Sequence, residues 1–254
     1  GTDAGHVRVY SSFTYVPDDN FEQALIDFGY DDVLDDYVQT ENISGVTYLD
    51  VDDKGISDLT GIEGFTAVTD LRIRYNQLTS LDVSNNTALL TIRANENQLT
   101  SINVSNNTAL SGLSCAYNNL TELDMSNNPL LDYLEVTSNQ ITVLDLSNNT
   151  VLDYLDCSSN QLTTLDMRNG VTDQLTTFNA TENSLDCIEV KAEDVAYAME
   201  NWTYANGNID EGVGFSVVCA PEGYTYVPDN NFEQALIDLG YDDVLNEFVL
   251  TASI

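Results

Sequence analysis

Apolar and polar residues recur with a period of 21 between positions 68 and 151, and each period contains two near-copies of a shorter pattern. In that pattern, three apolar residues are followed by an asparagine, as in Val68-x-x-Leu71-x-Ile73-x-x-Asn76, Leu78-x-x-Leu81-x-Val83-x-x-Asn86 and Leu89-x-x-Ile92-x-Ala94-x-x-Asn97. A fixed period of this length is typical of a solenoid, in which each coil buries its apolar side by stacking on its neighbours. Because solenoids present long, regular surfaces, the pattern favours binding over catalysis.

The alternation within each half-repeat predicts short strands. Leu, Ile and Val at alternate positions point inward from a strand, and the polar residues between them point outward. The asparagine at each bend can hydrogen-bond to backbone groups that a tight coil would otherwise leave unpaired. We therefore expect two short strands per coil, the second weaker than the first, and almost no helix inside the solenoid.

The motif L-x-x-L-x-L-x-x-N resembles the leucine-rich repeat over residues 43 to 188. The nested half-repeat, for example residues 99–107, resembles a bacterial variant in which units of ten and eleven residues alternate. The chain is thus similar to secreted bacterial leucine-rich-repeat proteins. This resemblance implies an α/β repeat solenoid, made mostly of short parallel strands with helical caps at both ends. The asparagines that carry the motif are Asn76, Asn97, Asn118, Asn139, Asn160 and Asn183.

Two coils depart from the period. The first, residues 46–67, has 22 residues and carries Lys54-Gly55 where an asparagine would fall. The coil after Leu152 runs for 23 residues before Leu175, because Arg168-Asn-Gly-Val-Thr-Asp replaces the usual Ser-Asn-Asn-Thr-Ala. We expect a local bulge there. Seven coils in all are enough for a continuous core.

The flanking segments have the character of caps. Residues 18–29 predict a short amphipathic helix, with acidic residues at its start and glycine after its end. A second helical turn is expected at residues 31–38. Residues 192–202 have helical spacing and would cover the last coil.

The N-terminal cap recurs at the end of the chain: residues 225–254 match 14–43 at a constant offset of 211, with 22 of 30 positions identical. We therefore expect a fragment of a larger multidomain protein with tandem modules. The predicted parts are a remnant of a preceding repeat domain or linker (1–13), a helical N-terminal cap (14–45), the solenoid (46–184), a C-terminal cap (185–221) and the start of a second N-terminal cap (222–254).

The four cysteines form two classes. Cys115 and Cys157 occupy inward positions two coils apart, on the order of 10 Å at a strand spacing of about 4.8 Å. That exceeds the roughly 7 Å Cα limit for a disulfide, so we expect buried thiols. Cys187 and Cys219 flank the predicted C-terminal helix and are either bridged or free. We favour the disulfide, which would imply an oxidising, extracellular location, either secreted or on the cell surface.

Acidic residues dominate the composition, with 42 acidic against 7 basic side chains and a formal charge of −35. Nucleic acid and anionic membrane surfaces are poor partners for such a field, and we expect no membrane insertion. A solvated acidic coat accounts for the charge without any bound ion. No cofactor other than calcium is suggested by the sequence.

Calcium is the alternative explanation for part of this charge. The stretch 50–55 begins like a calcium loop, but Lys54 occupies a ligand position and no glutamate closes the loop at the twelfth residue. A second set of acids, Asp82, Asn103, Asp124, Asp145 and Asp166, forms a ladder at strand spacing, where bound cations would relieve repulsion. The candidate calcium ligands are Asp50, Asp52, Asp124 and Asp145.

The first strand of each coil is the candidate ligand face. Arg72, Arg74 and Arg93, three of the five arginines, lie within two adjacent coils. Aromatics beside arginines are enriched at protein interfaces, and sugar rings also stack on tyrosine. Either this face binds a ligand, or the arginines neutralise Asp50, Asp52, Asp70 and Glu96. The tyrosines assigned to the same face are Tyr48, Tyr75, Tyr117, Tyr133 and Tyr154.

Catalysis finds little support in the sequence, and we expect no enzyme. His6 is the only histidine and precedes the solenoid, so no Ser-His or Cys-His pair exists within it. The sequence favours an extracellular module that binds protein or polysaccharide on the strand face. The alternative is an architectural spacer or adhesin stalk stabilised by cations. We expect a mostly monomeric protein, with self-association through the duplicated tail as the alternative.

Overall fold

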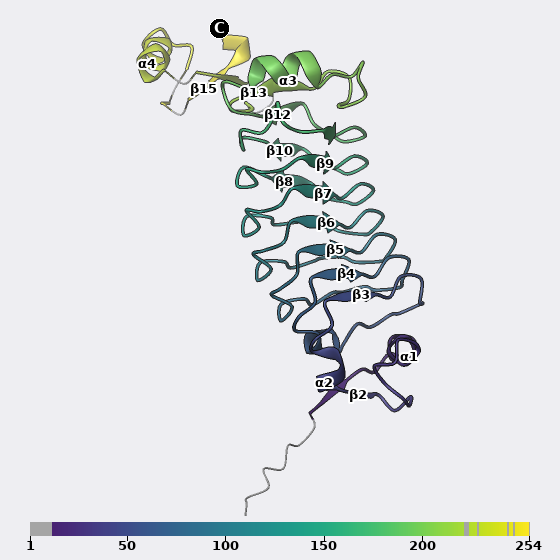
Figure 1. Ribbon diagram of the computed structural model, residues 1–254. Helices are drawn as coiled ribbons and strands as arrows, with labels where there is room; N and C mark the ends of the chain where they lie inside the picture. Colours follow the sequence, from purple (N-terminus) through teal and green to yellow (C-terminus); the bar gives the residue numbers. More distant parts are fainter. Residues whose placement is uncertain (1–11, 221–223, 228, 243, 246, 254) are drawn as a thin grey trace, which may run out of the picture.

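The computed structural model describes residues 12–220, 224–227, 229–242, 244–245 and 247–253. His6 and most of the predicted leading remnant therefore lie outside the described residues. The coils stack into an elongated solenoid, with helical segments at both ends (Figure 1). None of the helices in the described ranges combines the length and the apolar character needed to span a bilayer.

The main sheet contains one short parallel strand from each coil, in the order β11-β9-β7-β6-β5-β4-β3. The strands pair in register, so that Leu71 lies between Leu49 and Ile92, and each of these central side chains is buried. The strands are β3 (Tyr48–Asp50), β4 (Asp70–Arg72), β5 (Thr91–Arg93), β6 (Gly112–Ser114), β7 (Tyr133–Glu135), β9 (Tyr154–Asp156) and β11 (Thr177–Asn179).

A second, weaker sheet lies on the other side of the coils, in the order β13-β12-β10-β8. In the earlier coils this row is reduced to a parallel bridge between Asp82 and Asn103. Helix within the described part of the solenoid is limited to the 3-10 turn η1 (Ile62–Gly64). Across the described coils, the expected weaker second strand is therefore confirmed for the later coils and is reduced or absent in the earlier ones. The second-row strands are β8 (Val143–Asp145), β10 (Thr164–Asp166), β12 (Cys187–Glu189) and β13 (Gly214–Ser216).

The motif asparagines connect the coils, as Asn118 illustrates. Its Nδ2 donates to the carbonyls of Ala94 and Cys115, both at 3.0 Å, and its Oδ1 accepts from Leu99 N at 2.9 Å. Because the bend places these backbone groups in the interior, an unpaired donor or acceptor there would carry a desolvation penalty. The amide thus closes its own turn and binds the preceding coil.

The N-terminal cap contains a strand pair and two helices: β1 (Phe13–Tyr15), α1 (Asp19–Asp27), β2 (Tyr37–Gln39) and α2 (Thr40–Ile43). The helical turn expected at 31–38 is wrong. β2 instead pairs antiparallel with β1, with Val38 opposite Thr14. The Glu22 carboxylate accepts from Asp35 N at 3.0 Å and Tyr37 N at 3.1 Å, which satisfies these amides in an extended loop.

One continuous core extends from this cap to the C-terminal cap. At the N-terminal end, the Phe21 ring of α1 lies 6.2 Å from Phe65 of the first coil. At the other end, Trp202 follows α3 (Val195–Asn201) and stacks on Phe178, with 3.8 Å between ring centroids. Both ends of the solenoid are therefore sealed by aromatic contacts.

The cysteines have the predicted states. Cys115 and Cys157 are free and buried, and burial raises the pKa of the Cys115 thiol to about 12. Cys187 and Cys219 form a disulfide with a Cα–Cα distance of 5.7 Å. This bridge joins β12 to the segment that follows β13, so it fastens the C-terminal cap to the last coil.

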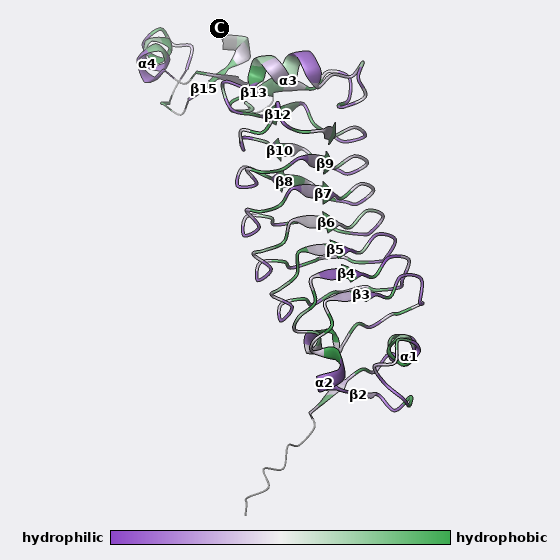
Figure 2. Ribbon diagram, in the orientation of Figure 1, coloured by the Kyte–Doolittle hydropathy of each residue, from purple (hydrophilic) through white to green (hydrophobic). Residues whose placement is uncertain are grey.

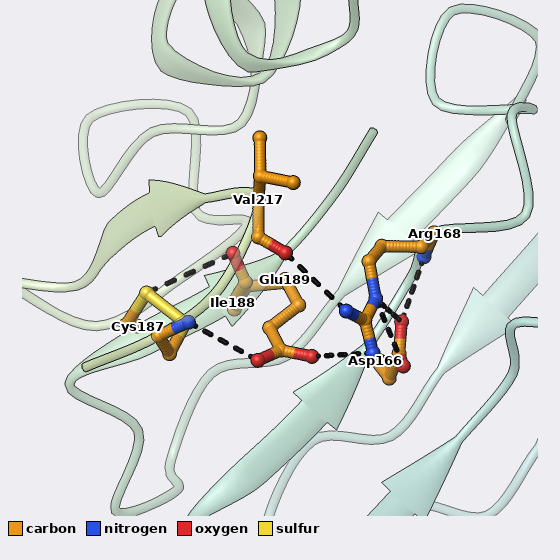
Figure 3. Close-up of a disulfide and its surroundings, with 7 residues drawn as sticks. Asp166, Arg168, Cys187, Ile188, Glu189 and Val217 are labelled. Carbon is orange, nitrogen blue, oxygen red and sulfur yellow. Dashed lines mark hydrogen bonds and ion pairs between the residues drawn. A yellow bond between two sulfur atoms is a disulfide. The ribbon is translucent and has the colours of Figure 1, made fainter. Parts of the chain in front are cut away.

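The expected bulge after β10 is a loop that begins at Arg168. Its guanidinium lies 2.5 Å from Asp166 and 2.9 Å from Glu189 of β12, next to the disulfide (Figure 3). Arg168 also donates to the carbonyl of Val217 at 3.4 Å. The inserted residues thus connect the second sheet to the C-terminal cap.

The tail forms a small unit beside the C-terminal cap (Figure 1). It contains β14 (Tyr224–Tyr226), α4 (Asn230–Asp238), β15 (Phe248–Leu250) and η2 (Thr251–Ser253). Val227, Leu236 and Val249 form a core of their own, separate from that of the solenoid.

Candidate functional site

The outward side chains of the main sheet form two rows, which we call the strand face. Sheet register places Arg72 beside Arg93 in one row, and Tyr133 beside Tyr154 in the other. β4, which carries Asp70 and Arg72, is drawn as hydrophilic in Figure 2, whereas β6 is close to neutral. In chain order the rows are Asp50, Arg72, Arg93, Ser114, Glu135, Asp156 and Asn179, and Tyr48, Asp70, Thr91, Gly112, Tyr133, Tyr154 and Thr177.

The predicted arginines do come together, and acids accompany them. The Asp70 carboxylate lies 3.3 Å from Arg72 Nε and 3.2 Å from Arg93 Nη1, so it bridges adjacent strands. Arg74, just after β4, pairs with Asp52 at 2.6 Å. Hydrogen bonds to Asp70 and Asp52 raise the pKa values of Arg72 and Arg74, which therefore stay protonated.

These pairs leave the guanidinium groups accessible. The side chains of Arg72, Arg74 and Arg93 remain 30%, 36% and 36% exposed. Exposed ion pairs contribute only about 0–1 kcal/mol each. An arginine has five N–H donors, so donors remain for a ligand after pairing. Asp50 also lies 4.0 Å from Arg72, whereas Glu96 makes no ion pair with the arginines in the described part of the chain.

The predicted tyrosines divide into two groups. Tyr48, Tyr133 and Tyr154 lie on the strand face, where the rings of Tyr133 and Tyr154 stack at 4.3 Å and Arg72 lies 5.0 Å from the centre of the Tyr48 ring. Tyr75 and Tyr117 instead occupy turn positions with φ of 57° and 56°, and both are 55% exposed. They border the strand face and are not part of its two rows.

A hollow of about 430 Å³ opens over β6 in the middle of the strand face. It forms because the side chains of Gly112 and Ser114 are small. The neighbouring strand on one side carries Thr91 and Arg93 at these positions, and the strand on the other side carries Tyr133 and Glu135. One wall is cationic and the opposite wall is acidic. The polar side chains of these walls are Arg74, Arg93, Asp132, Tyr133 and Glu135.

A polar network lines the floor of this hollow. Ser114 Oγ is within hydrogen-bond distance of Asn95 Oδ1 and Glu135 Oε2. Glu135 Oε2 also accepts from Asn95 Nδ2 at 3.2 Å and from Tyr133 OH at 3.4 Å. Burial, together with the charge of Glu135, raises the pKa of Tyr133, so its phenol remains a donor. The hollow therefore combines cationic donors with a carboxylate acceptor.

The repeat motif alone does not reveal this hollow. The signal was present, because Gly112 falls where neighbouring coils carry Thr91 and Tyr133. A cavity from a small side chain between two larger ones requires three strands in known register, which the motif alone does not supply.

Calcium ligation stays a prediction. Asp50 and Asp52 lie beside Arg72 and Arg74, and in the described ranges no three His, Cys, Asp or Glu side chains gather in an arrangement that could hold a metal ion. The candidate residues of the acidic ladder have another role. Asp124 accepts from Ser126 N and Asp145 from Ser147 N, both at 2.9 Å, so each carboxylate caps its own turn.

The same kind of hydrogen bond lowers the pKa values of two ladder acids, Asp82 and Asp124. Hydrogen bonds from the Ser126 side chain and backbone lower the pKa of Asp124, and those from Ser84 lower the pKa of Asp82. Carboxylates that accept such bonds favour their charged form. These carboxylates therefore stabilise the turns that follow them.

Comparisons with known proteins agree with this architecture. Residues 119–142 match the family model described as Leucine Rich Repeat. Internalin J from Listeria monocytogenes is 38% identical over 84 residues, which are 33% of this chain and 9% of that protein. The chain thus spans less than a tenth of the curated relative it matches.

Solved structures give a similar result. The functional domain of internalin J from Listeria monocytogenes, described as including a cysteine ladder, aligns with a TM-score of 0.63 and 29% identity, over 83% of this chain and 50% of that one. Internalin C2 from the same species aligns with a TM-score of 0.53 and 17% identity, over 82% of this chain and 100% of that one. A leucine-rich-repeat protein from Leptospira interrogans aligns with a TM-score of 0.51 and 18% identity, over 60% of this chain and 45% of that one.

At such identities the last two structures show the fold alone. The matched repeat, the internalin J similarity and the stacked parallel strands agree with the resemblance found in the sequence motif. Residues 119–142 match a leucine-rich repeat, and the stacked coils of this chain form a solenoid with a fold similar to that of the internalin J domain.

Proposed function

We propose that this chain is an extracellular recognition module, which binds a protein or polysaccharide through the strand face and performs no catalysis. The observation that carries the proposal is the hollow over Gly112, with Arg74 and Arg93 on one wall and Glu135 on the other. Concave sites with a few convergent polar groups are the usual form of ligand sites. The leucine-rich-repeat architecture supports a role in recognition.

The charged side chains of the hollow indicate which chemical groups a ligand would carry. Arginine forms bidentate hydrogen bonds with carboxylates, so Arg74 and Arg93 would bind an acidic group, such as a uronic acid or an acidic protein loop. Glu135 would accept from a hydroxyl or amide group of the same ligand. The adjacent Tyr133–Tyr154 pair adds an aromatic surface next to these polar groups.

The disulfide supports an extracellular location. Cys187 and Cys219 are bridged, and such bonds persist mainly in oxidising compartments. A net charge of −35 also favours solubility. Secretion or display on the cell surface is therefore part of the proposal.

A screen followed by a graded series at Gly112 tests this function. The full chain is applied to arrays of acidic polysaccharides and of proteins, and Kd is then measured for the strongest binder. A Cβ at Gly112 would lie 3.4 Å from Thr91 Cγ2, so the backbone accepts a small side chain there. We expect G112A to weaken binding slightly and G112T, which fills the hollow without changing charge, to weaken it at least tenfold. Equal Kd values across the series would rule out the hollow as the site.

The second candidate is an architectural spacer, or an adhesin stalk stabilised by cations. The ion pairs of Arg72, Arg74 and Arg93 with Asp50, Asp52 and Asp70 favour it, because the arginines already neutralise nearby acids. A spacer has no selective ligand. If neither array gives a reproducible binder, the spacer becomes the better account.

A further inference from the structure

We infer that the tail from Tyr224 to Leu250 is a second capping unit, whose open face binds the first coil of a leucine-rich-repeat solenoid of the type formed by residues 46–67. This inference is independent of the strand face and of its proposed ligand. It rests on a comparison within one molecule, because residues 12–43 show what the same sequence does when a coil covers it.

The two units share their elements and their strand register. β14 and β15 pair antiparallel with Thr225 opposite Val249, as β1 and β2 pair with Thr14 opposite Val38. Each helix has nine residues and begins after an aspartate. The tail thus reproduces the backbone of the N-terminal cap.

Local hydrogen bonds are also reproduced. Asp229 Oδ1 accepts from Asn231 N and Phe232 N at 2.9 Å, as Asp18 Oδ1 accepts from the equivalent amides of α1 at 3.0 Å. Thr225 and Thr251 join the strand pair to the following turn, at 3.0 Å between hydroxyls, as Thr14 and Thr40 do at 2.9 Å. The tail is therefore folded as a cap in its own right.

The difference between the two units lies in what covers the helix. Phe21 is fully buried against the first coil, whereas its counterpart Phe232 is 58% exposed. Ala24 is buried and Ala235 is exposed. Val227, Leu236 and Val249 stay buried in a core separate from the solenoid, and Phe232 and Ala235 are exposed on the face that meets a coil in the N-terminal cap.

The polar contacts of the first interface identify the partner. Asp18 Oδ2 accepts from Ser57 N and Ser57 Oγ at 2.8 Å, and from Asp58 N at 3.0 Å. Asn20 Nδ2 donates to the carbonyl of Gly55 at 3.0 Å. In the described residues, the carboxylate of Asp229 bonds only to amides of its own helix.

The tail keeps the residues that make these contacts. Asp18, Asn20 and Phe21 recur as Asp229, Asn231 and Phe232. The eight positions that differ between the two units lie elsewhere in the cap: 19, 28, 35, 36, 37, 39, 41 and 42. A partner that offers an apolar pocket, two backbone amides and one carbonyl in the arrangement of residues 55–65 fits this face. The chain's own first coil is occupied by α1, so the coil that binds the tail is a different one.

A graft in the full chain tests whether the tail sequence seals a coil. The variant carries D19N, F28L, D35N, D36E, Y37F, Q39L, E41A and N42S, so that residues 14–43 have the sequence of the tail. We expect its Tm to stay within about 3 °C of the parent. Adding F21S should lower Tm by about 6–15 °C in both backgrounds, because a buried aromatic is lost. A graft that melts as low as the F21S parent overturns the inference.

A matched pair tests whether the tail face is open in this chain. F21S removes the covered phenylalanine and F232S its exposed counterpart, and we expect only F21S to lower Tm. If F232S lowers Tm as much, the face is already packed within this chain and the inference fails. Sedimentation of the parent and of F232S tests whether the tail of a second copy of this chain covers the face instead. A dimer of the parent that F232S dissociates, together with a destabilised graft, would show that the tail binds a second tail and would overturn the coil as its partner.

Discussion

The carboxylate of Asp18 accepts two hydrogen bonds from Ser57, 39 residues away, each 2.8 Å long and one of them from the backbone amide. The other oxygen of the same carboxylate caps α1 through Asn20 N and Phe21 N at 3.0 Å. One side chain therefore begins the cap helix and fastens it to the first coil.

This arrangement predicts an acid-sensitive contribution to stability. Burial acts to raise the pKa of Asp18, but the hydrogen bonds from Ser57, Phe21 and Asp58 outweigh it, so the pKa of Asp18 is lowered from its ordinary value of 3.8. A lowered folded pKa gives stability that is present above the unfolded value and is lost as pH falls through the folded value. We expect D18N to lose about 1–3 kcal/mol at pH 7, and the Tm difference from the parent to shrink below about pH 3.8. Melts from pH 2 to 7 measure this, and D229N in the exposed copy should follow the parent; a D18N gap that stays constant with pH would contradict it.

The motif asparagines give a second prediction. N118A removes an amide that contacts four backbone groups within and between coils, so interior donors and acceptors lose their partners. We expect a loss of about 2–4 kcal/mol, since each unsatisfied buried group costs about 1–3 kcal/mol and some will rehydrate. The neighbouring exposed Asn119, whose side chain accepts from Gln140 Nε2 at 3.3 Å, is the control. Urea unfolding that gives N118A and N119A the same midpoint would show that the motif asparagines do not hold the coils together.

Much of the fold could be predicted from the sequence because the repeat carries it. Alternate apolar residues and the bend asparagine are local signals repeated many times, and they predicted the stacked strands and the buried positions of Cys115 and Cys157. The strand at Tyr37 was missed because 31–38 has a helical spacing, while the pairing of Val38 with Thr14 and the bonds to Glu22 are long-range. The hollow was missed for a related reason. It depends on Gly112 lying between Thr91 and Tyr133, a relation between coils.

Salt should stabilise the protein. Acidic side chains recur at adjacent positions of the second sheet, as Asp145 and Asp166 do in neighbouring strands. At physiological ionic strength, screening shortens the reach of their repulsion to about 8–10 Å. We expect Tm to rise with sodium chloride. A saturable further rise in calcium chloride at equal ionic strength is expected only if calcium has a specific site. Superimposable curves in the two salts would remove Asp50, Asp52, Asp124 and Asp145 as calcium ligands.

The disulfide predicts a local effect at one end of the molecule. Cys187 and Cys219 close a loop of 32 residues that contains α3 and β13. Removing the disulfide with C187S/C219S should lower the free energy of unfolding by an amount on the order of 3–4 kcal/mol in the chain-entropy model, chiefly within that cap. We expect hydrogen exchange to accelerate in 190–219 while residues 68–151 keep their protection. Uniform acceleration would show that the cap and the solenoid unfold together.

The central claim is that the strand face binds an acidic ligand through its arginines. The most direct test is the Kd of the triple variant R72S/R74S/R93S for the ligand found on the arrays, beside R168S as a matched control. Arg168 is also ion-paired with acids and 39% exposed, but it lies next to the second sheet. We expect the triple variant to lose binding at least a hundredfold with its melting curve little changed, and R168S to bind as the parent does. Unchanged affinity in the triple variant, or an equal loss in R168S, would contradict the assignment of the strand face.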